Sequence, residues 1–149
     1  MVSELAAHMS YAETVDLLGR LLGLELEESS AEQIVAEVGA RVRAQQQQWR
    51  AQALAGELSV PDAPERLYLG VDGAHAHIDG SWHEVKHVVA QVEGEARRYD
   101  AARAPAEQFG ERVYALAAGL GVEQAGEVVM VGDGAEWIWN LTAMHFPDA

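Results

Sequence analysis

Two strand-like runs joined by a tight-turn signal constrain this fold more than any other feature of the sequence. The runs are Leu67–Ile78 and Trp82–Val92, and Asp79-Gly80 lies between them. An Asp-Gly pair favours a two-residue turn with positive φ angles, because such a turn matches the right-handed twist of the flanking strands. The sequence therefore predicts a long antiparallel β-hairpin over residues 67–92.

The segments after the hairpin predict the rest of an α/β domain. Glu95–Ala101 reads as a third short strand, and Pro105 opens a helix that ends near Gly119 and Gly121. Glu127–Val131 is a short, continuously apolar run typical of a strand buried on both faces, and Ala135–His145 reads as a last helix. A right-handed crossover would place the fourth strand parallel to the first and beside it. The expected fold class is α/β, with a three-stranded meander, a helix, a parallel strand and a helix, as in the front half of an RNase H-like sheet.

The segment before the hairpin, from Met1 to Ala55, predicts a helical hairpin. Ser10 and Glu13 have the spacing of a capping box, and Gly23 is placed to end the helix that begins there. A second helix is expected from a cap at Ser29 or Ser30 to about Leu54. Two helices joined by a short turn are compatible with a helix-turn-helix that binds DNA, or with a hairpin that packs on the next domain or on another subunit.

A linker separates the two predicted modules. Residues 56–65 contain Pro61 and Pro64 with few large apolar side chains. The expected organisation is a helical region over 1–55, a linker over 56–65 and a sheet domain over 66–149.

Charge and cysteine content limit the function classes. The chain has 24 acidic and 10 basic residues, a formal net charge of −14, and no cysteine, so a metal must bind through oxygen or imidazole. DNA binding usually needs basic surface. Arg41, Arg43 and Arg50 form the densest positive cluster of the first half. This cluster either contacts phosphate or forms a solvated face.

No apolar run is long enough to span a bilayer and no export signal is visible, so a cytoplasmic location without a membrane partner is expected.

Two aspartates are the strongest candidates for chemistry. Asp72 follows Leu69-Gly70-Val71 on the first predicted strand, and Asp133 follows the fourth. Neighbouring strands would bring the two carboxylates together, where they can share hard divalent cations that activate a water or a 3′-hydroxyl. The alternatives are a turn residue for Asp72 and the N-cap of the last helix for Asp133.

Histidines and aromatic residues offer rival sites. His75, His77, His83 and His87 lie on the two strands of the predicted hairpin, where gathered imidazoles bind zinc or simply cover a solvated face. Trp139 is a candidate for stacking on bases, whereas Trp137 is expected in the core of the last helix.

Three stretches resemble insertion-sequence transposases of the Kra group. They are Leu67-Tyr68-Leu69-Gly70-Val71-Asp72-Gly73, Trp82-His83-Glu84-Val85-Lys86, and Val131-Gly132-Asp133-Gly134-Ala135-Glu136-Trp137-Ile138-Trp139-Asn140. The segment His145-Phe146-Pro147-Asp148-Ala149 is also similar to the family. The resemblance implies an RNase H-like domain with a triad of two aspartates and a glutamate. Asp72 and Asp133 would be its catalytic, metal-binding aspartates, Mg²⁺ or Mn²⁺ its cofactor and transposon-end DNA its partner, with Arg41, Arg43 and Trp139 as candidate DNA contacts.

The chain differs from the family in one respect. Family members continue past the Phe-Pro-Asp-Ala segment to the glutamate that completes the triad, whereas this chain stops at Ala149. Glu84 and Glu136 do not match that glutamate. The expectation is therefore a truncated transposase, inactive alone, whose strand ending at Val131 has an open edge that favours homo-oligomers. A noncatalytic acidic interaction protein is the alternative, and a histidine-bound metal protein is the third choice.

Overall fold

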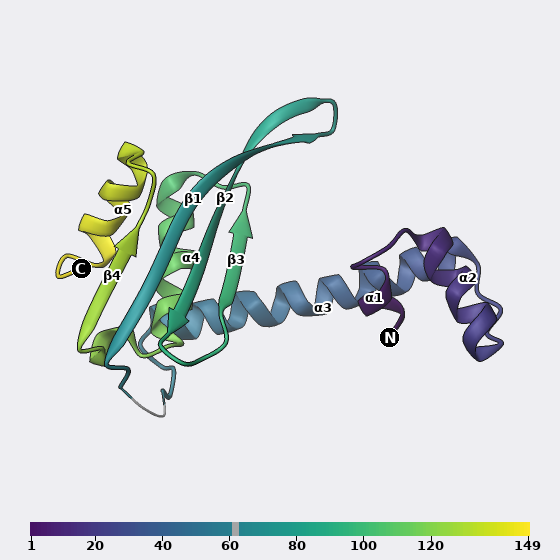
Figure 1. Ribbon diagram of the computed structural model, residues 1–149, viewed down its shortest axis with the longest axis horizontal. Helices are drawn as coiled ribbons and strands as arrows, with labels where there is room; N and C mark the ends of the chain where they lie inside the picture. Colours follow the sequence, from purple (N-terminus) through teal and green to yellow (C-terminus); the bar gives the residue numbers. More distant parts are fainter. Residues whose placement is uncertain (61–62) are drawn as a thin grey trace. The chain divides into compact units, whose positions relative to one another are not determined.

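The computed structural model describes residues 1–60 and 63–149 and contains two compact units (Figure 1). The helical unit is Met1–Gln48 and the sheet unit is Trp49–Ala149. The division falls within helix α3 (Glu28–Leu54) and not in the predicted linker at 56–65. Pro61, one of the two prolines that suggested the linker, lies outside the described residues, and Pro64 is buried.

The helical unit confirms the predicted helix pair. Helix α2 (Tyr11–Leu22) begins with a capping box, in which the backbone N–H of Glu13 donates to Ser10 Oγ at 3.3 Å and the backbone N–H of Ser10 donates to the Glu13 carboxylate at 2.9 Å. Gly23 ends α2 at φ +65°. Two features differ from the prediction. A short helix α1 (Val2–Leu5) precedes the pair, and α3 begins at Glu28, so Ser29 and Ser30 lie inside the helix they were expected to cap.

The sheet unit contains a mixed four-stranded sheet in the order β3-β2-β1-β4. Strands β1 (Arg66–Ile78) and β2 (Ser81–Val92) form the predicted hairpin, β2 pairs antiparallel with β3 (Arg98–Ala102), and β1 pairs parallel with β4 (Glu127–Val131). Ile78 pairs with Ser81, and the two turn residues have φ values of +51° and +81°. The positive angles agree with the turn expected for Asp-Gly.

Two strands differ from their predictions. Strand β3 begins at Arg98 instead of Glu95, because Glu95 belongs to a turn in which its N–H donates to the Val92 carbonyl at 3.0 Å. Strand β4 is an edge strand and is not buried on both faces, since Val131 is 58% exposed. The continuous apolar run suggested burial on both faces, but within it only Val128 and Met130 pack against the core.

The core lies between one face of the sheet and helices α4 (Ala106–Ala118) and α5 (Glu136–His145) (Figure 1). Alternate residues of β1 point toward these helices, and β2 contributes the same way. Trp49 also packs here, and a Cβ at Gly119 would overlap its ring. The last turns of α3 therefore belong to the sheet unit. The buried core residues are Leu67, Leu69, Val71, Val88, Ala90, Phe109, Val113, Leu116, Ala117, Leu120, Ile138, Leu141 and Phe146.

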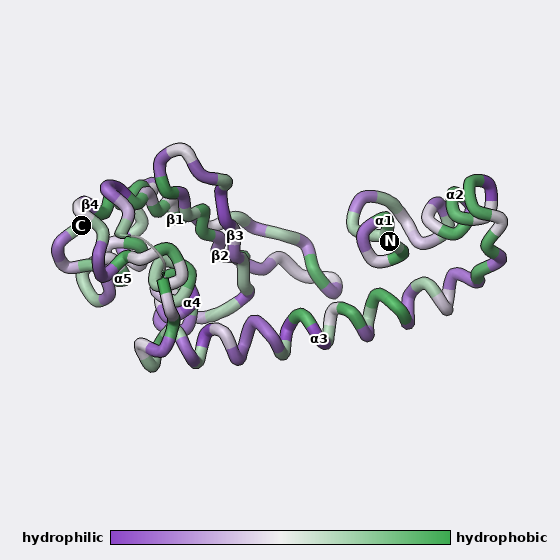
Figure 2. Tube along the Cα trace, turned by 90° about the horizontal axis from the view of Figure 1, so that it is seen from below, coloured by the Kyte–Doolittle hydropathy of each residue, from purple (hydrophilic) through white to green (hydrophobic). Residues whose placement is uncertain are grey.

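The opposite face of the sheet is more open. Tyr68, Val89 and Val129 are half-buried, whereas Tyr99 is 69% exposed. Figure 2, which colours the Cα trace by hydropathy, shows hydrophobic residues along the strands of the sheet unit. We call the face opposite the core the open face.

The β1–β2 hairpin extends beyond both of its neighbours. Strand β3 pairs with β2 only as far as Lys86, and β4 pairs with β1 only as far as Gly70. Residues 74–85 consequently form a two-stranded arm that projects from the sheet (Figure 1).

Candidate metal site at the end of strands β1 and β4

The strand register brings Asp72 and Asp133 to neighbouring positions. The paired residues run from Arg66 with Glu127 to Gly70 with Val131, and the residue numbers in every pair differ by the same amount, 61. The residue numbers of Asp72 and Asp133 also differ by 61, since 133 − 72 = 61. The two segments stay adjacent past the last pair, because a Cβ at Gly132 would lie 3.5 Å from the Val71 carbonyl oxygen. Asp72 and Asp133 therefore each lie two residues beyond the last paired residues, Gly70 and Val131, and have the same separation in residue number as the pairs of the ladder.

Asp72 lies within β1 and presents an exposed carboxylate on the open face. Its neighbour Val71 points into the core, so the alternation of side chains directs Asp72 the other way. One carboxylate oxygen accepts a hydrogen bond from the Gly73 N–H at 2.7 Å, and the other lies 3.7 Å from Nε2 of His87. The alternative of a turn aspartate is wrong, because the strand continues beyond it to Ile78.

Asp133 lies in the connection between β4 and α5. Its Oδ1 accepts a hydrogen bond from the Ala135 N–H at 3.0 Å. Ala135 is the N-cap of α5 and makes no side-chain cap bond, so the alternative of Asp133 as the N-cap is wrong. Gly134 has φ +93°, a conformation that suits glycine and lets the chain turn from the strand into the helix.

Both aspartates have exposed carboxylates. Oxygen ligands suit Mg²⁺ or Mn²⁺, and Mg²⁺ commonly keeps several waters while it binds one or two carboxylates. Among residues 1–60 and 63–149, no three His, Cys, Asp or Glu side chains gather closely enough to hold a metal ion. Glu84 pairs with Lys86, and Glu136 lies in the first turn of α5.

The four histidines of the hairpin are not gathered into one cluster. The register places His75 opposite Glu84 and His77 opposite Trp82, so these two imidazoles share one face of the arm. His83 and His87 lie on the other face, where His83 Nε2 is 2.7 Å from Ser81 Oγ. The alternative in which these imidazoles gather to bind zinc is wrong, because alternate strand positions point to opposite faces.

The three candidate DNA contacts are all exposed. Arg41 and Arg43 lie on α3 in the helical unit, and Trp139 on α5 is 43% exposed. Trp137 packs edge-on against Phe109, as expected for a core residue. Arg50 belongs to the sheet unit, where burial and the nearby Arg112 guanidinium lower its pKa.

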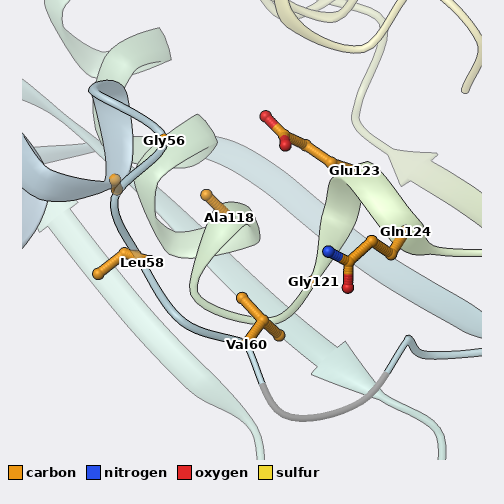
Figure 3. A pocket seen from close by; sticks show the side chains of 8 residues that line it. Gly56, Leu58, Val60, Ala118, Gly121, Glu123 and Gln124 are labelled. Carbon is orange, nitrogen blue, oxygen red and sulfur yellow. The ribbon is translucent and has the colours of Figure 1, made fainter.

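Two cavities of the sheet unit are lined by residues other than Asp72 and Asp133. One has a volume of about 40 Å³ and lies near Gly56, Val60 and Gly121, around the segments that lead into β1 and β4 (Figure 3). That space suits a water molecule or two. The other is an open groove of about 390 Å³ between α4 and α5, lined in part by Trp137 and Met144.

The contact between Asp72 and His87 was not predicted, although the sequence contains the signal for it. A two-residue turn at Asp79-Gly80 pairs residues whose numbers sum to 159, as Ile78 does with Ser81. The same sum pairs Asp72 with His87, since 72 + 87 = 159.

Comparisons with protein-family models and with curated proteins find no match for this sequence. Within the described ranges, no helix combines the length and the apolar character needed to cross a bilayer.

Proposed function

We propose that the sheet unit belongs to the RNase H-like catalytic domain of an insertion-sequence transposase, with Asp72 and Asp133 as its metal-binding carboxylates. The observation that carries the proposal is the constant separation in residue number along the β1–β4 pairing, which the two aspartates share. The resemblance of the stretches around Asp72 and Asp133 to the Kra-group transposases supports the same function. DNA is the proposed substrate, with Arg41, Arg43 and Trp139 as proposed contacts.

The donor set fits a hard divalent cation. When bound, Mg²⁺ or Mn²⁺ supplies activation of a water or 3′-hydroxyl and stabilisation of the leaving oxygen of a phosphodiester. The Gly73 N–H orients one oxygen of Asp72, and the Ala135 N–H orients one oxygen of Asp133. Each carboxylate keeps lone pairs for a cation, because the backbone bond engages only one oxygen.

Mn²⁺ binding in Asp72→Asn and Asp133→Asn tests the proposal. Each change removes a charged ligand, so the dissociation constant should rise at least about tenfold, with unfolding unchanged because both side chains are exposed. Asp79→Asn is the matched control, because Asp79 is exposed and asparagine tolerates its positive φ. Calorimetric titration with Mn²⁺ and nicking of duplex DNA are the measurements. Equal Mn²⁺ affinity in wild type and both site variants would exclude the metal site.

The second candidate function is a noncatalytic interaction protein that self-associates through β4. The outer edge of β4 pairs with no strand in the described part of the chain, and its acidic residue, Glu127, is paired with Arg66. A strand edge with few unpaired charged side chains favours backbone pairing with a strand of another chain. Sedimentation should then give a dimer that Val131→Lys dissociates, together with no Mn²⁺ binding. A monomeric wild type would remove this alternative.

A further inference from the structure

Lys86 is a nearly buried cation close to the candidate metal site. Its residue is 7% exposed, and it lies on β2 beside Val88 on the face that α4 and α5 cover. It pairs across the hairpin with Gly73, the residue after Asp72. Lysine is almost never this buried unless it is paired, so its partners indicate what it holds in place.

Two groups surround the Lys86 ammonium. It forms an ion pair with the Glu84 carboxylate, and it lies 5.2 Å from the centre of the Trp137 ring, within the range of a cation–π interaction. Trp137 is in the first turn of α5, shortly after Asp133 in the sequence. Lys86 therefore connects β2 to the start of the helix that follows Asp133.

Glycines allow close packing behind both aspartates. A Cβ at Gly73 would lie 2.8 Å from the Glu84 carboxylate, so Glu84 occupies the space beside β1 directly after Asp72. A Cβ at Gly132 would lie 2.9 Å from the side chain of Ile138, so α5 presses against the residue directly before Asp133. The Glu84–Lys86–Trp137 contacts thus lie beside Gly73 of β1 and near the start of α5, next to the two residues that carry the carboxylates.

We propose that Lys86 is a positioning residue that sets the place of Asp133 relative to Asp72 by holding the first turn of α5 against β2. The inference rests on the proposed metal site. Only Gly132–Ala135 connects β4 to α5, so a shift of Trp137 moves Asp133, whereas Asp72 lies within a continuous strand. Loss of an outer contact that orients a metal ligand typically costs about 10- to 100-fold in metal affinity.

Lys86→Met tests this role, because it keeps most of the length of the side chain and removes the charge. The Mn²⁺ dissociation constant should rise about 10- to 100-fold, and Lys86→Arg, which restores a cation over the Trp137 ring, should recover most of the affinity. Trp137→Phe weakens the same contact and should give a smaller rise, which keeps the test open if Lys86→Met does not fold. Thr142→Val is the matched control, since it removes a buried hydrogen bond to the Ile138 carbonyl farther along α5 and should leave the affinity unchanged.

A second readout does not depend on metal. The chain has no cysteine, so Asp72→Cys with Asp133→Cys introduces a single pair, and neighbouring strands about 4.8 Å apart are within the reach of a disulfide. Added Lys86→Met should slow oxidation of this pair several-fold, and added Lys86→Arg should not. If wild type binds no Mn²⁺, the metal site is wrong and the oxidation rate alone decides whether Lys86 positions residue 133. Unchanged Mn²⁺ affinity in Lys86→Met, or unchanged oxidation where wild type binds no Mn²⁺, would overturn the inference.

Discussion

The helical unit and the sheet unit both have amphipathic helices, but they bury them to different extents. In the sheet unit, α4 buries Phe109, Val113 and Leu116 against the sheet. In the helical unit, α2 buries only Thr14 and Leu18, and Leu22, which was expected on the same apolar stripe, is 54% exposed. Helical periodicity identifies the apolar face, whereas burial also requires a second layer to cover it.

The difference has a consequence for stability. A helix pair with few buried side chains depends on caps and local bonds for much of its stability, whereas a helix packed on a sheet depends on its core. The two units should therefore respond to different substitutions. All four tryptophans, Trp49, Trp82, Trp137 and Trp139, belong to the sheet unit, so their fluorescence reports on that unit alone.

Phe109→Ala should have the largest effect, and only on the sheet unit. Phe109 is fully buried and packs against Trp137, so its removal should cost about 3–5 kcal/mol of unfolding free energy. Urea unfolding followed by tryptophan fluorescence measures the change. Gln108→Ala, at the exposed neighbouring position, should stay within about 0.5 kcal/mol of wild type. If the urea midpoints from helical circular dichroism and from fluorescence shift by the same amount, the two units unfold together and are not independently stable.

Ser10→Ala should have a smaller effect, confined to the helical unit. It removes the acceptor for the Glu13 N–H at the start of α2, which typically costs about 1 kcal/mol. Circular dichroism should lose helical signal at lower urea while the fluorescence transition stays in place. Ser29→Ala is the control, because Ser29 already lies within α3. An equal loss in both variants would mean that the capping box contributes nothing specific.

Acidification should have the smallest effect, and it should destabilise the sheet unit at a higher pH than the helical unit. Burial lowers the pKa of His145 from its ordinary value of 6.5, against the opposing charge of Glu111. The unfolded chain then binds the proton more readily, so the sheet unit loses stability as the pH falls below about 6.5 toward the lowered pKa. In the helical unit, hydrogen bonds from Ser10 lower the pKa of Glu13. The stability that these hydrogen bonds contribute is therefore lost only as the pH falls below 4.5.

Fluorescence-monitored urea unfolding between pH 7 and 5 checks this order, with the pH steps chosen around the ordinary value of 6.5. His145→Gln should flatten the pH dependence of the sheet unit, and His75→Gln, which removes an imidazole from the exposed arm, is the control. A pH slope that survives His145→Gln would assign the effect to another group.

The hairpin and the place of β4 beside β1 could be predicted from the sequence. Asp79-Gly80 specifies the turn locally, and the right-handed crossover rule places β4 parallel to β1. The burial of Lys86 could not be predicted, because it depends on where α5 packs after the chain has turned at Gly134. Nor could the division within α3, because the helix continues through the polar tract Gln45–Gln48 to Trp49, and only the packing of Trp49 assigns it to the sheet unit.

The arm at residues 74–85 has one further consequence, for how the protein can change over evolutionary time. Because the arm pairs only with itself and paired positions alternate in hydrogen bonding, adding or removing two residues from each strand near Asp79-Gly80 would change its length while keeping the two-residue turn. A single inserted residue in one strand would instead turn every later side chain to the opposite face unless a bulge absorbed it. Related chains should therefore vary in arm length mainly by two residues in each strand at a time, while the distance from Asp72 to the base of the arm stays constant.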